Sequence, residues 1–104
     1  MWNVQFENMK VQSEVELLIK SGRLTRADEE VIAAWIRQIS MHGPESIRAD
    51  RKWADHDLED EWAGHRSSAF STRGRIIYRV EEKIVKIKIS RITDVHDYKK
   101  GGKP

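Results

Sequence analysis

Apolar residues recur along this chain first at the spacing of helices and later at the spacing of strands. From Met9 to Lys20 they fall three and four residues apart, and Gly22 follows where a left-handed helix cap is expected. A second stripe of this period covers residues 26–42 and ends before Gly43-Pro44. The pattern predicts two helices joined by a short connection, and we expect them to pack as an antiparallel hairpin.

Alternating apolar and polar positions predict strands on both sides of this helical region. Residues 2–6 place Trp2, Val4 and Phe6 on one face of a short first strand. Residues 44–64 contain seven acidic residues and are predicted to be mostly irregular, with a short turn of helix at the start. Three strands follow, the last two joined by a turn at 81–83: His65–Ser71, Arg75–Glu81 and Ile84–Ile92.

This element order predicts an α+β fold in which an N-terminal strand, an antiparallel helical hairpin and an antiparallel β-meander build one small twisted sheet. A chain of 104 residues has room for one hydrophobic core. We therefore expect a single domain over residues 1–98. Residues 99–104 have nothing apolar to bury, so they are predicted to form a flexible basic tail. Trp35 lies in the apolar stripe of the second helix, which places it in the core.

Several classes of protein are disfavoured by what the sequence lacks. There is no cysteine, which removes disulfides, thiolate zinc sites and cysteine nucleophiles. The N-terminus has no basic region followed by an apolar stretch, and no apolar run is long enough to span a bilayer. We therefore expect a cytoplasmic protein without a membrane partner.

The formal net charge of +2 hides a strong asymmetry between the two parts of the chain. Residues 1–61 carry 8 Lys and Arg against 13 Asp and Glu, whereas residues 62–104 carry 11 against 4. The basic C-terminal part attracts phosphate backbones through counterion release. A charge-rich segment is also common on ordinary solvated surfaces. The motifs must therefore decide between nucleic-acid binding and a solvated surface.

Three local motifs carry a resemblance to a known family. The run His56-Asp57-Leu58-Glu59-Asp60-Glu61-Trp62-Ala63-Gly64-His65-Arg66 is similar to the His-x-Leu-x-Gly-x-Trp-x-Gly-x-Arg segment of YafQ-type toxins. Arg75-Ile76-Ile77-Tyr78-Arg79-Val80 follows at the expected distance, and Thr93-Asp94-Val95-His96-Asp97-Tyr98 resembles the ending of YafQ- and YoeB-like members. Together with the element order, these segments resemble the RelE/ParE superfamily of type II toxin–antitoxin systems.

The resemblance implies a toxin that acts as a metal-independent endoribonuclease, an mRNA interferase working in the A site of the 70S ribosome. Its partners would be mRNA, ribosomal RNA and a cognate antitoxin, and it would need no cofactor. Two alternatives stay open. One is a ParE-like poison of DNA gyrase, and the other is a non-catalytic relative that only binds nucleic acid.

The residues that match the family motifs suit RNA cleavage. Such a reaction needs a base for the 2′-hydroxyl, cationic donors for the phosphorane and an acid for the leaving oxygen. The resemblance assigns these roles to His56 as base, Arg75 as phosphate contact and His96 as acid, since histidine exchanges protons near neutral pH. The competing interpretations are a solvated loop histidine, a surface strand arginine and an inert terminal histidine.

Further cations and an aromatic residue are expected to contact RNA. The predicted RNA-binding residues are Arg73, Tyr98, Arg91 and Lys86. Arg73 would be a second phosphate contact. Tyr98 would stack on a base or, alternatively, cap the core.

The remaining histidines and aromatics favour structural roles. His65 and Trp62 are predicted to pack, and His42 to interact with the last carbonyls of the second helix. The four histidines lack compact metal-ligand spacing, so we predict no metal.

The chain departs from the family pattern at three positions. Asp60 stands where a glycine is common. Ala69 and Arg73 stand where YafQ-type toxins have a second histidine and an aspartate, and Arg73 makes this chain closer to RelE and YoeB there.

Overall fold

The computed structural model describes residues 1–93, with side chains described through Lys86 in the last strand. The N-terminal part contains one strand and three helices: β1 (Asn3–Phe6), α1 (Met9–Lys20), α2 (Arg26–His42) and α3 (Pro44–Ala49). The rest contains two short 3-10 turns and four strands: η1 (Arg51–Trp53), β2 (His56–Asp57), η2 (Asp60–Trp62), β3 (Arg66–Ala69), β4 (Arg75–Glu81) and β5 (Ile84–Thr93). The predicted α+β class is confirmed, whereas the predicted domain end at residue 98 lies outside the described residues.

Local sequence signals explain where the first two helices begin and end. The Asn8 side chain accepts a hydrogen bond from the Val11 N–H at 2.9 Å and caps α1. Thr25 and Asp28 form the predicted capping box at the start of α2, with reciprocal hydrogen bonds of 3.1 and 3.0 Å. Both helices have the predicted bounds because these caps coincide with the ends of the apolar stripes.

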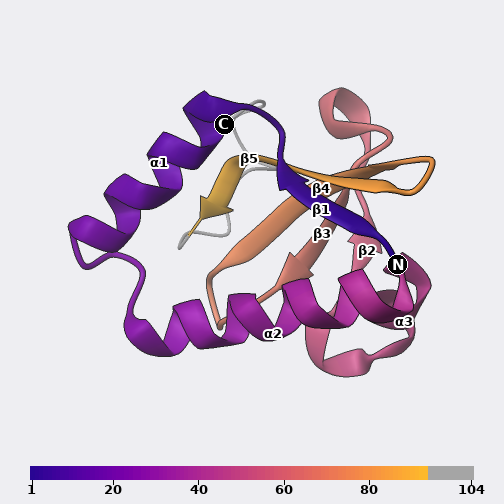
Figure 1. The fold of residues 1–104 in the computed structure, drawn as a ribbon, viewed down its shortest axis with the longest axis horizontal. Coiled ribbons are helices and arrows are strands. Elements are labelled where there is room, and N and C mark those ends of the chain that lie inside the picture. The colour runs from indigo at the N-terminus through magenta and orange to yellow at the C-terminus, as the bar shows by residue number, and fades with distance from the viewer. Residues whose placement is uncertain (94–104) are drawn as a thin grey trace.

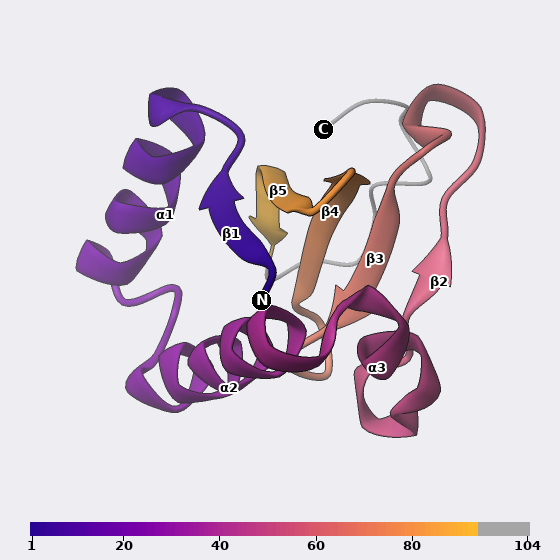
Figure 2. The same ribbon diagram turned by 45° about the vertical axis from the view of Figure 1, so that its right-hand side comes forward.

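The sheet has five strands in the order β1-β5-β4-β3-β2, and Figure 2 shows β2 at its edge beside β3. β1 runs parallel to β5, and the other neighbours are antiparallel. β3 is shorter than predicted. The His65 N–H donates to the Trp62 carbonyl at 2.9 Å before it, and the Phe70 N–H donates to the Gly74 carbonyl at 3.1 Å after it. These two turns set the ends of the strand.

The two long helices differ from the prediction in their packing. α1 packs mainly on β1 and β5, whereas α2 packs mainly on β1 and α3. Figure 1 shows them at a wide angle to one another. Their connection contains Gly22 at φ +83 and Leu24, which is buried in the core. The hairpin prediction therefore holds for the order and connection of the helices, and it needs correction because each helix packs its apolar stripe on the sheet.

One main hydrophobic core lies between the helices and one face of the sheet. It contains Trp35 from α2, as predicted, together with Ile76 and Tyr78 from β4 and Val85 from β5. A smaller cluster of Leu58, Ile77 and Trp62 packs separately from it. Because Ile76 and Ile77 are neighbours in a strand, they point to opposite faces. We call the face with Ile76 and Tyr78 the helix face and the face with Ile77 the opposite face.

No helix in the part of the chain that the structure describes is long and apolar enough to cross a membrane.

Candidate active site

His56 lies in a strand that the sequence pattern did not predict. β2 falls within the segment expected to be irregular, and it pairs His56 with Ser67 of β3, which in turn pairs with Ile77 of β4. Directly paired residues of antiparallel strands share a face. His56 therefore belongs to the opposite face of the sheet, away from the main core.

Arg75 belongs to the same face, because it is two residues before Ile77 in β4. It pairs with Ala69 of β3 and with Thr93 of β5. His56 is two strands away and displaced by two residues along them, which puts the two Cα atoms on the order of 12 Å apart. The Arg75 guanidinium donates to the Gly74 carbonyl at 2.9 Å. The structure thus brings the two predicted residues to one face of the sheet, on strands separated by β3.

The two predicted RNA-binding cations that the structure describes lie at different places. Arg73 is exposed in the turn between β3 and β4. Lys86 pairs with Arg79 across the strands, and its ammonium group contacts Glu81 at 3.1 Å. Hydrogen bonds from Arg79 and Lys86 lower the pKa of Glu81, so this carboxylate stays charged and competes with phosphate for Lys86.

His96 and Tyr98 lie outside the described residues, and so does the side chain of Arg91, whose backbone is part of β5. What the structure does describe is the strand that leads to them. β5 ends at Thr93, directly opposite Arg75.

The loop between β2 and β3 packs on the opposite face. Trp62 contacts the cluster of Leu58 and Ile77, and the His65 ring stacks edge-on against Trp62 with centroids 5.1 Å apart. The predictions that Trp62 and His65 pack are therefore confirmed. Asp60 has φ +58, a left-handed conformation that favours glycine. The loop keeps the geometry of a glycine position although the residue differs.

A buried carboxylate beside His56 was missed by the sequence motifs. The Asp55 side chain is fully buried, accepts a hydrogen bond from Arg66 Nε at 2.9 Å, and forms an ion pair with Arg66 Nη2 at 2.7 Å. Ser68 Oγ and Tyr78 OH donate to its other oxygen at 2.7 and 2.6 Å. The Trp35 indole N–H completes the network by donating to Ser68 Oγ at 3.0 Å. An aspartate in an acidic segment gives no sequence signal of this role, because its partners are far away in sequence.

Tyr78 makes the fold less stable as the pH rises into the alkaline range. Burial raises the pKa of its hydroxyl well above 10, and the charge of Asp55 raises it further. Its contribution to stability is complete below the unfolded-state pKa of about 10 and is lost as pH rises above it, because only the unfolded chain then releases the proton. We expect the free energy of unfolding to fall by up to about 1.4 kcal/mol per pH unit above pH ~10 from this group. Urea unfolding of Tyr78→Phe should show a shallower alkaline decline than the parent, and equal slopes would contradict the assignment.

Within residues 1–93, no group of three or more Asp, Glu, His or Cys side chains is arranged to hold a metal ion. The absence of a metal site stays a prediction for the whole chain.

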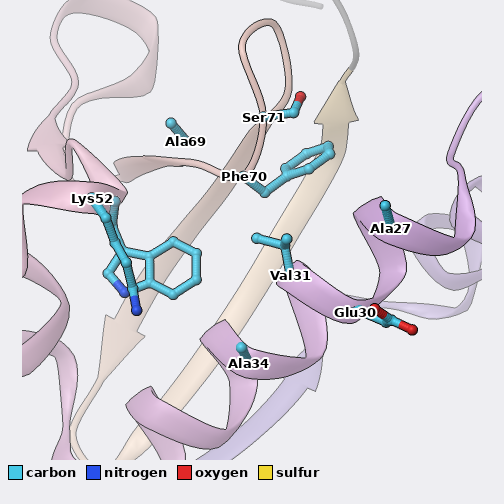
Figure 3. A pocket seen from close by; sticks show the side chains of 9 residues that line it. Ala27, Glu30, Val31, Ala34, Lys52, Ala69, Phe70 and Ser71 are labelled. Atoms are coloured by element: carbon cyan, nitrogen blue, oxygen red, sulfur yellow. The ribbon is translucent and has the colours of Figure 1, made fainter.

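The helix side of the molecule carries a separate pocket, shown in Figure 3. Its volume is about 540 Å³, and it lies between the first half of α2 and the end of β3. Val31 and Phe70 face each other across it, and Lys52 lies at its border (Figure 3). Neither His56 nor Arg75 lines this pocket, so it is distinct from the predicted site.

Comparison with known proteins finds solved structures that are similar to this one. Scans against models of known protein families and against curated proteins give no match. YoeB from Staphylococcus aureus matches with TM-score 0.62 and 15% identity, over 84% of this chain and 91% of its own. YafQ from Escherichia coli gives TM-score 0.61 and 16% identity, over 83% and 84%. A copper-bound mutant toxin from Helicobacter pylori gives 0.56 and 18%, over 84% and 89%.

The chain therefore shares its fold with YoeB and YafQ over most of its length, and the predicted RelE-like fold is confirmed.

Proposed function

We propose that this protein is the toxin of a type II toxin–antitoxin pair and that it cleaves mRNA on the ribosome without a metal. The observation that carries the proposal is the placement of His56 and Arg75 on one face of a RelE-like sheet, with β5 ending opposite Arg75. His96 follows Thr93 by three residues, a reach of at most about 10 Å. The length of the connecting chain therefore allows His96 to reach the face that carries His56 and Arg75.

The proposed chemistry is an attack of the 2′-hydroxyl on the adjacent phosphate. His56 accepts the hydroxyl proton, Arg75 stabilises the charge on the phosphorane, and His96 gives a proton to the 5′-oxygen that leaves. The products are a 2′,3′-cyclic phosphate and a 5′-hydroxyl end. Arg75 suits the phosphate because its planar fork matches two oxygens at once, and RNA would draw the guanidinium away from the Gly74 carbonyl.

The proposed RNA contacts extend from this centre. Arg73 is exposed at the turn next to Arg75 and provides a second cation for the backbone. Tyr98 and Arg91 are proposed to contact a base and the backbone. Lys86 contributes only if it exchanges Glu81 for phosphate, so we expect it to matter least.

A toxin of this kind requires a protein that neutralises it. The solved relatives include a YoeB-YefM complex and a DinJ-YafQ toxin-antitoxin complex. We propose a cognate antitoxin as the protein partner and the cytoplasm as the place of action.

Expression of the chain alone tests the proposal. We expect bacterial growth to stop and primer extension on cellular mRNA to reveal new in-frame cuts. His96→Ala, expressed at the same level, should allow growth because it lacks the proposed acid.

Two outcomes would contradict the proposal. Growth arrest with intact mRNA and trapped gyrase–DNA complexes would indicate a ParE-like poison. Unimpaired growth with abundant folded protein would indicate a non-catalytic relative.

A further inference from the structure

Asp55 is anchored on the helix face immediately before His56 in the chain. Its carboxylate is fully buried, accepts one hydrogen bond each from Arg66, Ser68 and Tyr78, and forms an ion pair with Arg66. These partners belong to β3 and β4, so the anchor ties the start of β2 to the centre of the sheet. A carboxylate with this many donors has little freedom to move.

The backbone on the other side of this anchor controls the ring of His56. Ala54 has φ 48 and ψ 42, a left-handed conformation that a residue with a Cβ rarely adopts. Its carbonyl oxygen lies 3.1 Å from His56 Nδ1. A carbonyl only accepts hydrogen bonds, so Nδ1 is the atom of the neutral ring that carries the proton. The lone pair is then on Nε2.

Nε2 of His56 has the properties expected of a general base that has not yet accepted a proton. It is covered from solvent and has no hydrogen-bond partner in the described part of the chain. A buried polar atom without a partner is uncommon and often marks a functional position. A hydroxyl of the substrate would supply the missing partner once the groups around the ring shift.

We infer that Asp55 is a positioning residue for His56: by holding the Ala54 carbonyl against Nδ1, it selects the ring tautomer whose Nε2 can accept a proton. The assignment of His56 as the base rests on the proposed function, whereas the control of its tautomer by Asp55 does not. The role is analogous to that of carbonyl or carboxylate groups that orient a histidine elsewhere in proteins.

Asp57, on the other side of His56, provides a matched control. Its side chain is 70% exposed and forms an ion pair with Arg48 at 2.6 Å. Asp57 follows His56 directly as Asp55 precedes it, so replacing it removes the same charge at the same distance along the chain. Within the described residues its link to Asp55 is indirect, through Arg48, which lies 3.8 Å from the Asp55 carboxylate.

The experiment compares Asp55→Asn, Asp57→Asn and the parent protein by NMR of ¹⁵N-labelled histidine, at alkaline pH where the ring is neutral. In the parent and in Asp57→Asn, the His56 shifts should show a protonated Nδ1 and an unprotonated Nε2. In Asp55→Asn, the amide places an N–H₂ group against one of the network's donors, so the anchor loosens and the shifts should move toward a mixture of tautomers.

In cleavage assays we expect kcat of Asp55→Asn to fall about 10-fold with little change in KM, and kcat of Asp57→Asn to stay within about two-fold of the parent.

The outcomes separate this inference from the proposed function. His56 shifts in Asp55→Asn identical to those of the parent would overturn the inference, whatever the cleavage rates. A loosened tautomer in Asp55→Asn together with no RNA cleavage by the parent would support the inference and overturn the proposed function. If Asp55→Asn does not fold, Tyr78→Phe takes its place, because it removes only one of the three hydrogen bonds to Asp55. Unchanged His56 shifts in Tyr78→Phe would then overturn the inference, and a partial shift toward the mixture would support it.

Discussion

Replacing Arg75 with Ala is expected to lower the rate of RNA cleavage by about 10²-fold or more while leaving the fold intact. Arg75 pairs with Thr93 at the end of β5, and its guanidinium would stabilise charge that develops only in the transition state. Its contacts include the Ser71 and Gly74 carbonyls of the β3–β4 turn. Single-turnover cleavage of ribosome-bound mRNA measures the effect, and Arg75→Lys should recover part of it by keeping the charge without the planar fork.

Arg79 is the matched control for this prediction. It lies four residues further along the same strand and on the same face, but it is held by Glu7 at 3.2 Å and by Glu81 at 2.6 Å. Arg79→Ala should leave the cleavage rate within a few-fold of the parent. Equal losses of cleavage rate in Arg75→Ala and Arg79→Ala would mean that the sheet contributes only its overall positive charge and that Arg75 has no specific role.

Replacing Arg66 with Met is expected to lower the free energy of unfolding by about 3–5 kcal/mol, a large share of the total for a domain of this size. The Arg66 side chain is 11% exposed and that of Asp55 is fully buried. Removing the arginine leaves the buried Asp55 charge with hydrogen bonds from the neutral Ser68 and Tyr78 hydroxyls, and with the Arg48 cation no closer than 3.8 Å. Urea unfolding should show a midpoint lower by roughly 2 M, provided that the m-value is unchanged.

Arg48 tests whether burial is the cause of that effect. Its guanidinium lies 3.8 Å from the same Asp55 oxygen, but its side chain is 41% exposed and its closest contact is the exposed Asp57. Arg48→Met should cost no more than about 1 kcal/mol, because exposed ion pairs contribute little. Similar losses of unfolding free energy from Arg48→Met and Arg66→Met would show that the net charge of the cluster contributes more to stability than the buried Arg66–Asp55 pair.

The parts of the fold that the sequence predicted are those governed by local rules. The bounds of α1 and α2 follow from their apolar periods and from caps that lie within three residues of the helix ends. β4 was predicted with its observed bounds because a run of β-branched and aromatic residues separates two turns. His56 and Arg75 were found because they belong to short motifs whose order matches a known fold.

The parts of the fold that the sequence did not predict depend on contacts between residues that are far apart in the chain. β2 has only two residues, and its strand conformation comes from pairing with β3. The angle between α1 and α2 is set by the sheet on which both pack, and no periodicity reports it. Asp55 is one of seven acidic residues between positions 44 and 64, and only the folded chain brings Arg66, Ser68 and Tyr78 to it.

The parallel pairing of β1 with β5 has a consequence for the order in which the protein is made. β1 is synthesised about 80 residues before its partners in β5, which run from Ile84 to Ile87. Val85 of the same strand is fully buried in the main core. Closing a loop of about 80 residues must therefore precede the last contacts of the sheet, which slows folding more than local pairing would. A nascent or prematurely terminated chain that stops before β5 has neither a partner for its first strand nor a complete core. Such fragments would be unfolded and inert, so whatever activity the domain has begins only once β5 has been synthesised.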